Sequence, residues 1–396
     1  MKDMQELRRE GSIAIVGAGP GGAMLARLLQ MRGFNVRVFE RDGSPTARPQ
    51  GGSLDLRTDS GQRAIDAAEL TEPFARSSRE EAKAFRMVDA EGDELPGMGE
   101  DTHQDAGPEI DRGDLRQLLL DSLAPNTVAW NHMVEDVTPD VDGQWRVAFK
   151  DKAPIVADLV VGADGVGSKV RRRLTTEVPR YTGITMLAAN IRRDLWRGSK
   201  IDETLGEGSV MFAAGEKTIF VQRCSHDLIL LYYSLAVPEG WPKSESFDLS
   251  DTSAVLGKVR TAYADWSPDV LAMLTEVEDT FQPWPTSVMP PAHRWATQPG
   301  LTMLGDASHV MPPFTGKGVN LALLDALELA DGLSGDASSD VATVIEAFET
   351  RMQARTRDEI RACLDVGRQM YGIEMDFSDP TQDQARAPAN ARVVQR

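Results

Sequence analysis

The sequence predicts an α/β fold in which a parallel-sheet domain is interrupted by a mostly antiparallel sheet and followed by a long C-terminal helix. A strand–turn–helix–strand unit at residues 13–40 has the size of a βαβ crossover and indicates the parallel part. Strand patterns with polar turns between Tyr181 and Val237 indicate the antiparallel part. Apolar residues at helical spacing from Val341 to Tyr371 predict the long helix.

Charge and composition exclude several classes of partner. The 396 residues carry a formal net charge of -18, which argues against nucleic acid or an anionic membrane surface, since both attract basic proteins. Two cysteines, no signal-peptide pattern and no apolar run long enough to cross a bilayer predict a cytoplasmic protein. A monomer or a homodimer is expected, and the sequence does not choose between them. The main basic cluster, from Lys169 to Arg173, is expected to be a solvated helix face.

A glycine-rich turn joins the first strand of the βαβ unit to its helix. Gly17, Gly19 and Gly22 form the pattern GxGxxG, and Glu40 follows at the end of the second strand. In this context the glycines let the backbone approach a pyrophosphate, and the acidic residue binds ribose hydroxyls. Because Arg41 could instead meet a 2′-phosphate, this unit predicts a dinucleotide without deciding between FAD and NADP.

The second half of the chain favours FAD. Asp164 and Asp306 each follow a short apolar strand, and such an aspartate can bond the ribityl chain that FAD has and NADP lacks. After Asp306, the segment GDASHVMPPFTGKGVN leads into a helix whose positive end would stabilise a reduced flavin. Pro313 would fix this loop, and Gly316 and Gly318 would let backbone N–H groups approach the flavin ring.

Three ordered motifs, GAGPGG with its following Glu-Arg pair, GADGVGS and GDASHVMPPFTGKGVN, make the chain resemble the single-component FAD-dependent aromatic hydroxylases, or class A flavoprotein monooxygenases. Within that family, GGSLDL and EIDRGDLR are most similar to the tetracycline-inactivating flavin monooxygenases. The resemblance implies non-covalent FAD, NADPH or NADH as transient reductant, and O2 as co-substrate. It also implies a nicotinamide-cofactor contact near Arg48. The residues that are expected to contact FAD on this basis are Glu40, Arg41, Asp55, Arg112, Asp306, Val319 and Asn320.

The order of the motifs sets expected domain limits within this fold. A Rossmann-type FAD-binding domain is expected at residues 1–80, 100–178 and 284–335. An inserted, mostly antiparallel substrate-binding domain is expected at residues 81–99 and 179–283. A C-terminal helix at 336–375 is expected to bridge the two domains, and the polar tail at 376–396 is expected to be disordered.

The implied function is NAD(P)H-consuming hydroxylation of an aromatic or polycyclic small molecule, with tetracycline-type antibiotics, and hence antibiotic resistance, as candidates. The flavin would carry the oxygen as a C4a-hydroperoxide, so the protein's task is orientation and exclusion of water. No catalytic nucleophile or metal is expected, and the five histidines show no metal-ligand spacing. His309, within the loop after Asp306, is the one side chain considered for a direct role.

Differences from the tetracycline-inactivating relatives predict another substrate preference. Ala188 stands where the family has a substrate-binding glutamine, and the strand expected to supply an arginine reads SVMF from Ser209. Asn190, Gln222 and Arg223 are then the few polar candidates, so a less oxygenated phenolic or polycyclic compound is expected to be preferred. The expected pocket residues are Ala188, Asn190, Met211, Phe220, Trp284, Met311 and Phe314.

Three other functions stay open on this scaffold. A pyridine-nucleotide or disulfide reductase would need a second GxGxxG mid-chain and usually a cysteine pair, and the sequence has neither. A halogenase expects a WxWxIP-like motif, which FQPWPTSVMP does not supply. A non-catalytic flavin-binding redox sensor would show no substrate-stimulated oxidation of NAD(P)H.

Overall fold

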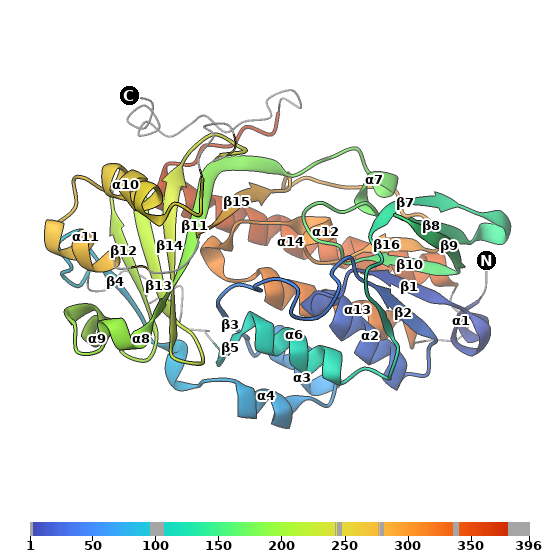
Figure 1. The fold of residues 1–396 in the computed structure, drawn as a ribbon. Helices are drawn as coiled ribbons and strands as arrows, with labels where there is room; N and C mark the ends of the chain where they lie inside the picture. Colours follow the sequence, from blue (N-terminus) through green and yellow to red (C-terminus); the bar gives the residue numbers. More distant parts are fainter. Residues whose placement is uncertain are drawn as a thin grey trace.

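The computed structural model describes residues 3–95, 107–241, 243, 248–275, 277, 281–335 and 340–378. Two regions lie side by side, one built on a parallel sheet and the other on an antiparallel sheet (Figure 1). The part of the expected disordered tail from residue 379 onward lies outside the described residues. No helix in the described part of the chain is both long and apolar enough to cross a membrane.

A five-stranded parallel sheet forms the base of the first region, in the order β16-β10-β1-β2-β6. Its strands are β1 (Ile13–Val16), β2 (Val36–Phe39), β6 (Val128–Ala129), β10 (Leu159–Gly162) and β16 (Leu301–Met303). The predicted βαβ unit is confirmed, because Ile13 of β1 pairs with Val36 of β2 in parallel register. All five strands therefore end at one edge of the sheet.

Both faces of the parallel sheet are covered, which explains why β1 is apolar throughout. Ile13 and Ile15 pack into a core with the helices, whereas Ala14 and Val16 pack against a three-stranded antiparallel sheet. That sheet consists of β7 (Val134–Pro139), β8 (Trp145–Phe149) and β9 (Lys152–Ala157). The helices of this region are α1 (Met4–Glu10), α2 (Pro20–Met31), α3 (Gly61–Ala67), α4 (Thr71–Ser77), α6 (Arg112–Asp121), α7 (Arg171–Leu174), α12 (Asp306–His309) and α13 (Gly318–Leu333).

The second region is a six-stranded, mostly antiparallel sheet in the order β15-β11-β14-β13-β12-β4. Its strands are β4 (Phe85–Val88), β11 (Arg180–Arg192), β12 (Ser209–Ala214), β13 (Lys217–Arg223), β14 (Leu228–Ala236) and β15 (Gln282–Val288). Only β4 pairs in parallel, with β12. Strand β15 crosses the domain limit expected at residue 284, because it pairs with β11 of the antiparallel sheet.

The two faces of this sheet differ. Leu187 and Leu231 point into a core that is closed by α8 (Arg193–Trp196), α9 (Lys200–Leu205), α10 (Thr252–Ala262) and α11 (Pro268–Leu274). The opposite face, called here the open face, carries a row of cross-strand neighbours. This row runs through Ala188, Tyr232, Phe220 and Met211. No helix of the α8–α11 group covers the open face, which is turned toward the first region (Figure 1).

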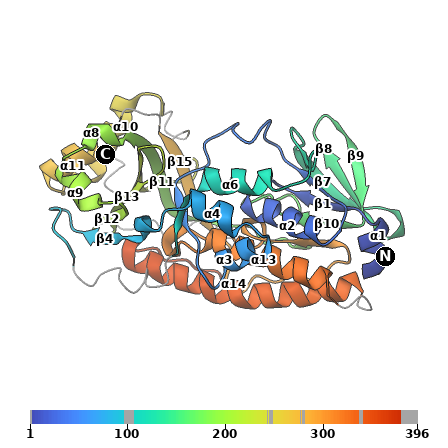
Figure 2. The same ribbon diagram turned by 90° about the horizontal axis from the view of Figure 1, so that it is seen from below.

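Two elements join the regions. A ribbon of β3 (Ser53–Asp55) and β5 (Glu109–Asp111) lies between the parallel and antiparallel sheets. Helix α14 (Val341–Tyr371) runs along one side of the whole molecule, as Figure 2 shows. Its first half packs into the core of the parallel-sheet region, and the hydroxyl of Tyr371 lies 3.0 Å from that of Thr218 in β13.

We predict that the first half of α14 contributes strongly to stability. Phe348 is fully buried in that core. Its replacement by alanine should lower the free energy of unfolding by about 3–5 kcal/mol, since it leaves a cavity. Chemical denaturation followed by circular dichroism measures this, with exposed Arg351→Ala as the matched control. A loss equal to that of the control would show that the helix is peripheral.

Candidate functional site

Four sequence motifs meet at the carboxyl edge of the parallel sheet. The glycine-rich turn follows β1, Glu40 follows β2, Asp164 lies just beyond β10 and Asp306 just beyond β16. These strands are neighbours in the sheet, so the four motifs lie next to one another along one edge. Such an edge, where the strand order changes direction beside β1, is where doubly wound sheets bind nucleotides.

The glycines of the turn have two different tasks. A Cβ atom at Gly17 would lie 2.3 Å from the carbonyl oxygen of Ala163, and one at Gly22 would lie 2.1 Å from that of Gly17. These two glycines are therefore required by the fold itself. At Gly19, however, a Cβ would meet no heavy atom within 4 Å. Gly19 is the residue just before α2, and no side chain caps that helix, so its first amide groups are left for an anionic ligand.

Glu40 holds the glycine-rich turn in place and lies at the same edge of the sheet. Its carboxylate accepts hydrogen bonds from the backbone N–H of Ala18 at 2.7 Å and of Asp42 at 2.9 Å. Each oxygen keeps a second lone pair with which it can accept a ribose hydroxyl. Sequence reasoning missed Arg116, which is buried and donates to the carbonyl oxygens of Ala18 and Pro45 at 2.9 and 2.8 Å. The leucine spacing of its helix gave no sign of this role.

The two aspartates offer acceptor atoms that the protein does not use. Asp164 accepts the N–H of Lys169 at 2.6 Å through one oxygen, while its other oxygen is buried without a partner. Burial raises the pKa of this carboxyl. Asp306 stands at the start of α12, and its carboxylate makes no hydrogen bond within the described part of the chain. Both groups suit hydroxyl groups of a bound ligand.

The loop from Gly305 to Asn320 carries the second uncapped helix. Gly316 adopts a left-handed conformation, with φ of 67°, and a Cβ there would lie 3.3 Å from Oδ1 of Asp55. Helix α13 starts at Gly318, where a Cβ would meet nothing within 4 Å, and no side chain caps it. Val319 occupies its first turn and is partly buried. The loop thus presents free amide groups beside Asp55.

Asn320 holds this loop to the rest of the site. Its Oδ1 accepts the backbone N–H of Arg57 at 2.9 Å and of Gly61 at 3.2 Å, and its Nδ2 donates to the carbonyl of Asp55 at 2.8 Å. The side chain is 1% exposed. Its amide group is therefore used within the protein, and only its backbone is available to a cofactor.

The expectation that residues from Lys169 to Arg173 form a solvated helix face is wrong for Arg171. This residue is 4% exposed and donates to the carbonyl oxygens of Ala307, at 2.9 Å, and of Val166. It thereby ties the loop after β10 to the loop after β16. A run of basic residues looks like a surface face in sequence, because nothing local shows that one member turns inward.

His309 lies in a buried network rather than at an open position. Its Nε2 lies 2.6 Å from Oδ2 of the fully buried Asp325, whose Oδ1 accepts from Arg355 at 2.7 Å. Burial opposes the charge on Asp325, but His309 and Arg355 outweigh it and hold its pKa below the usual value. Oδ2 of Asp325 also accepts the N–H of Gly305, so the network fixes the start of the loop.

The arginines expected at the cofactor differ in availability. Arg48 pairs with Asp42 at 3.0 Å on the surface. Arg41 is exposed, and Arg112, at the start of α6, is half-buried. Neither of these two guanidinium groups has a hydrogen-bond or ion-pair partner among the described residues. They are free to meet phosphates or a flavin ring, whereas Arg48 would first have to leave Asp42.

The ribbon is bonded to the open face of the antiparallel sheet. The N–H of Ser53 donates to Oε1 of Gln222 at 2.9 Å, and Nε2 of Gln222 donates back to the Ser53 carbonyl at 3.2 Å. Arg79 donates to Ser53 Oγ and to Asp111, both at 2.9 Å, and to the carbonyl of Arg223. These contacts bring the carboxyls of the ribbon to the junction of the two regions.

The predicted pocket residues lie on both sides of that junction. Five lie on the open face of the antiparallel sheet: Ala188, Asn190, Met211, Phe220 and Trp284. Phe314, from the loop, packs against Tyr371 with ring centroids 4.6 Å apart and shares an apolar cluster with Trp284. Met311 is 9% exposed and packs in a neighbouring core with Ile360.

Two of the expected polar candidates are committed elsewhere, which corrects that expectation. Both ends of the Gln222 amide bond to Ser53. Arg223 forms ion pairs with Asp202 and Glu207, each at 2.8 Å. The open face is consequently more apolar than the sequence alone suggested.

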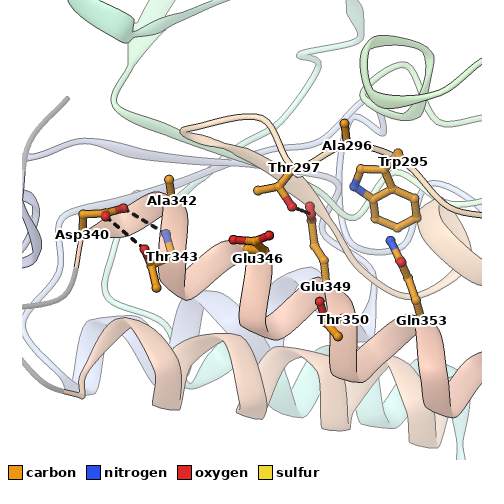
Figure 3. Close-up of a pocket in the computed structure, with 10 residues that line it drawn as sticks. All are labelled: Trp295, Ala296, Thr297, Asp340, Ala342, Thr343, Glu346, Glu349, Thr350 and Gln353. Atoms are coloured by element: carbon orange, nitrogen blue, oxygen red, sulfur yellow. Dashed lines mark hydrogen bonds between the residues drawn. The ribbon is translucent and has the colours of Figure 1, made fainter.

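A groove of about 430 Å³ lies on another part of the molecule, between α14 and the segment at residues 295–297 (Figure 3). Asp340, Glu346 and Glu349 give it an acidic lining, but none of the predicted site residues lines it. Glu349 is 2% exposed and accepts hydrogen bonds from Thr297 at 2.6 Å and from Thr302 at 2.8 Å, so its carboxyl is engaged within the fold. Among the described residues, no group of three or more histidine, cysteine, aspartate or glutamate residues could hold a metal ion.

The groups gathered at the sheet edge suit FAD. The uncapped start of α2 suits a pyrophosphate, the unpaired carboxylate oxygens of Asp164 and Asp306 suit hydroxyl groups, and the uncapped start of α13 suits the electron-rich edge of a flavin. The glycines at these positions leave open space where a side chain would stand. The apolar open face then lies across the junction from the loop.

We predict a pH-dependent stability term from Glu109, at the start of β5. Burial raises its pKa from about 4.5 to about 7, so between these pH values the folded protein binds more protons than the unfolded chain. The free energy of unfolding should fall by on the order of 2 kcal/mol as the pH rises through this window. Glu109→Gln should lack this fall in denaturation measured from pH 4.5 to 7. Parallel curves for the two proteins would contradict the raised pKa.

Proteins of known activity resemble most of the chain. It is 28% identical to Monooxygenase asqM of Emericella nidulans, over 94% of this chain and 96% of the relative. It is 30% identical to Monooxygenase penA of Penicillium thymicola, over 82% and 85%. It is 27% identical to 6-hydroxynicotinate 3-monooxygenase of Bordetella bronchiseptica, over 87% and 88%.

Solved structures share the fold. HpxO of Klebsiella pneumoniae, complexed with FAD and uric acid, superposes with a TM-score of 0.74 at 19% identity, covering 92% of this chain and 90% of that one. Tetracycline destructase Tet(51) superposes with a TM-score of 0.66 at 23% identity, covering 92% of each. The family model described as "FAD binding domain" matches residues 10–358. The chain therefore belongs to this FAD-binding family, and it is an FAD-dependent monooxygenase as its resemblance to the aromatic hydroxylases implied.

Proposed function

We propose that this monooxygenase uses NADPH or NADH and O2 to hydroxylate a phenolic or polycyclic aromatic compound. The proposal rests on the junction of the two regions. There the carboxyl edge of the parallel sheet, which is proposed to bind the nucleotide, meets the apolar open face of the antiparallel sheet. Bound FAD would supply the redox chemistry: NAD(P)H would provide two electrons, one atom of O2 would enter the substrate and the other would leave as water. The protein's residues would bind, orient and exclude water.

The cofactor would be held mainly by backbone groups and carboxylates. The start of α2 would bind the pyrophosphate, and Glu40 the ribose of the adenosine half. Asp306, with Asp164 beside it, would accept the ribityl hydroxyls. The start of α13 and the backbone from Gly316 to Asn320 would meet the flavin ring, with Asp55 and Arg112 beside it. These assignments rest on the free acceptors and uncapped helices.

The open face supports an apolar aromatic substrate. Ala188, Tyr232, Phe220 and Met211 form one continuous row there. Trp284 borders the segment just before the ribbon, since a Cβ at Gly51 would lie 3.5 Å from its ring. Because Gln222 and Arg223 have partners within the protein, few side chains remain to satisfy a heavily hydroxylated molecule. Unpaired polar groups cost about 1–3 kcal/mol each on burial. Tetracyclines are therefore proposed to be poor substrates.

The nicotinamide site, the role of His309 and the cellular setting are proposed from the expectations of the sequence analysis. The nicotinamide cofactor would bind transiently near Arg48, after the Arg48–Asp42 ion pair opens. His309 is proposed to position the loop through Asp325 rather than to react. The protein would act in the cytoplasm, as a monomer or homodimer, without nucleic acid as a partner.

The activity can be tested with a panel of substrates. We expect the purified yellow protein to oxidise NADPH or NADH faster when a phenolic or polycyclic compound is present, and to yield a product heavier by one oxygen atom. Absorbance at the nicotinamide band and mass spectrometry of the product measure the two effects. Oxidation that no compound in the panel stimulates would instead favour a redox sensor, and efficient turnover of tetracycline would contradict the proposed preference.

Asp306 should contribute to the retention of the cofactor. We expect Asp306→Ala to weaken FAD binding by about 1–3 kcal/mol, or roughly fivefold to 150-fold, because hydrogen bonds to a charged acceptor are lost. Fluorescence of FAD released on dilution measures this. Asp365→Ala, an exposed aspartate of α14, is the matched control. FAD affinity in Asp306→Ala equal to that in the control would remove Asp306 from the site.

A further inference from the structure

Two carboxyl groups face each other on the ribbon. Asp55 of β3 and Glu109 of β5 are direct partners in the antiparallel register, as are Leu54 and Ile110. Because side chains alternate along a strand, Leu54 and Ile110 point into the core while both carboxyls emerge on the opposite face. Groups directly opposite in such a pair have Cβ atoms only about 5 Å apart, and like charges there repel.

This pair of carboxyl groups borders the loop from Gly305 to Asn320. Oδ1 of Asp55 lies beside Gly316, and Arg57 links Asp55, at 3.1 Å, to the carbonyl of Thr315, at 3.2 Å. Glu109 therefore stands one strand away from the loop that is proposed to meet the flavin. On its other side, Oε2 of Glu109 lies 3.4 Å from the side-chain amide of Gln222.

The nearby cations are engaged by other acids. Arg57 pairs with Asp55, and Arg79 pairs with Asp111 at 2.9 Å. Within the described part of the chain, no cation lies within ion-pair distance of Glu109. Cys224 and Tyr232 face the same junction, and burial raises the pKa of each to about 12, so both stay neutral. The charged and polar groups that act on Glu109 are thus Asp55, Asp111, Arg79, Ser53 and Gln222.

Burial and two neighbouring carboxylates favour the neutral form of Glu109. Its pKa of about 7 reflects chiefly its removal from water, with the negative charges of Asp55 and Asp111 adding to the effect. The hydrogen bond with Ser53 and the charge of Arg79 oppose the shift without cancelling it. A neutral carboxyl can donate a hydrogen bond, which a carboxylate cannot.

We propose that Glu109 is a proton-carrying member of the FAD site, which holds the cofactor in its neutral form and weakens the hold when it ionises. FAD carries a negative pyrophosphate and electron-rich carbonyl groups on its ring. A second carboxylate beside Asp55 would add negative charge to the loop that receives the ring, so FAD binding and proton binding favour each other. This inference rests on the FAD site proposed above.

The test measures FAD retention by the purified holoenzyme as a function of pH. Wild type, Glu109→Gln and the exposed control Glu135→Gln are diluted from about pH 6 to about pH 8, and released FAD is read by its fluorescence. In wild type and control, the dissociation constant should rise about threefold to tenfold across this range. Glu109→Gln, which imitates the neutral acid, should stay near the low-pH value throughout.

A second measurement does not depend on the variant's folding. Infrared spectra of the wild-type holoenzyme should show the carbonyl stretch of a protonated carboxyl at about pH 6 that disappears by about pH 8. Absence of that band, or a Glu109→Gln variant with the pH dependence of wild type, would overturn the inference while leaving the FAD site intact. A wild-type protein that retains no FAD at any pH would overturn the site and the inference together.

Discussion

The parallel register of β1, β2, β10 and β16 is the constraint on which the site depends. It brings the ends of four strands, separated by up to nearly three hundred residues in the chain, to a single edge. Each end then contributes one kind of group: amide N–H groups after β1, a carboxylate after β2, and acceptors for hydroxyl groups after β10 and β16. Neither face of the sheet is open, since helices cover one and a three-stranded sheet the other. The edge is therefore the place where this part of the fold can receive a long, polar cofactor.

Buried guanidinium groups keep the loops at that edge in position. Arg116 holds the carbonyl oxygens of Ala18 and Pro45, and Arg171 joins the loops after β10 and β16. Carbonyl groups that would otherwise be buried without partners are satisfied in this way, while no side chain caps the amide groups at the starts of α2 and α13. At the last loop a carboxylate acts instead: Asp325, which is held by His309 and Arg355, accepts the N–H of Gly305 and so fixes the start of the loop. Arginine side chains thus hold backbone carbonyl groups in position, while uncapped backbone amide groups remain to bind the ligand.

The local patterns of the chain made much of this predictable. The strand–glycine–helix unit, the strand-end aspartates and helix α14 follow from spacing and composition. Ala188, Met211 and Phe220 are expected pocket residues, and the structure places them on one face. Sequence could not show that Arg116 and Arg171 turn inward, or that Gln222 bonds to Ser53 rather than to a substrate, because their partners are distant in the chain. The same is true of Glu109. Its position opposite Asp55 depends on a pairing between two strands more than fifty residues apart, so its raised pKa is a property of the tertiary structure.

We propose that one FAD molecule lies along the carboxyl edge of the parallel sheet, with its flavin ring between the loop at Gly316–Asn320 and the open face of the antiparallel sheet. A crystal structure of the protein purified with its natural chromophore tests this most directly. We expect pyrophosphate density at the start of α2, ribityl density within hydrogen-bond distance of Asp306 and a planar ring at the start of α13. Density for the chromophore in the acidic groove beside α14, or a ring that lies away from the open face, would contradict it.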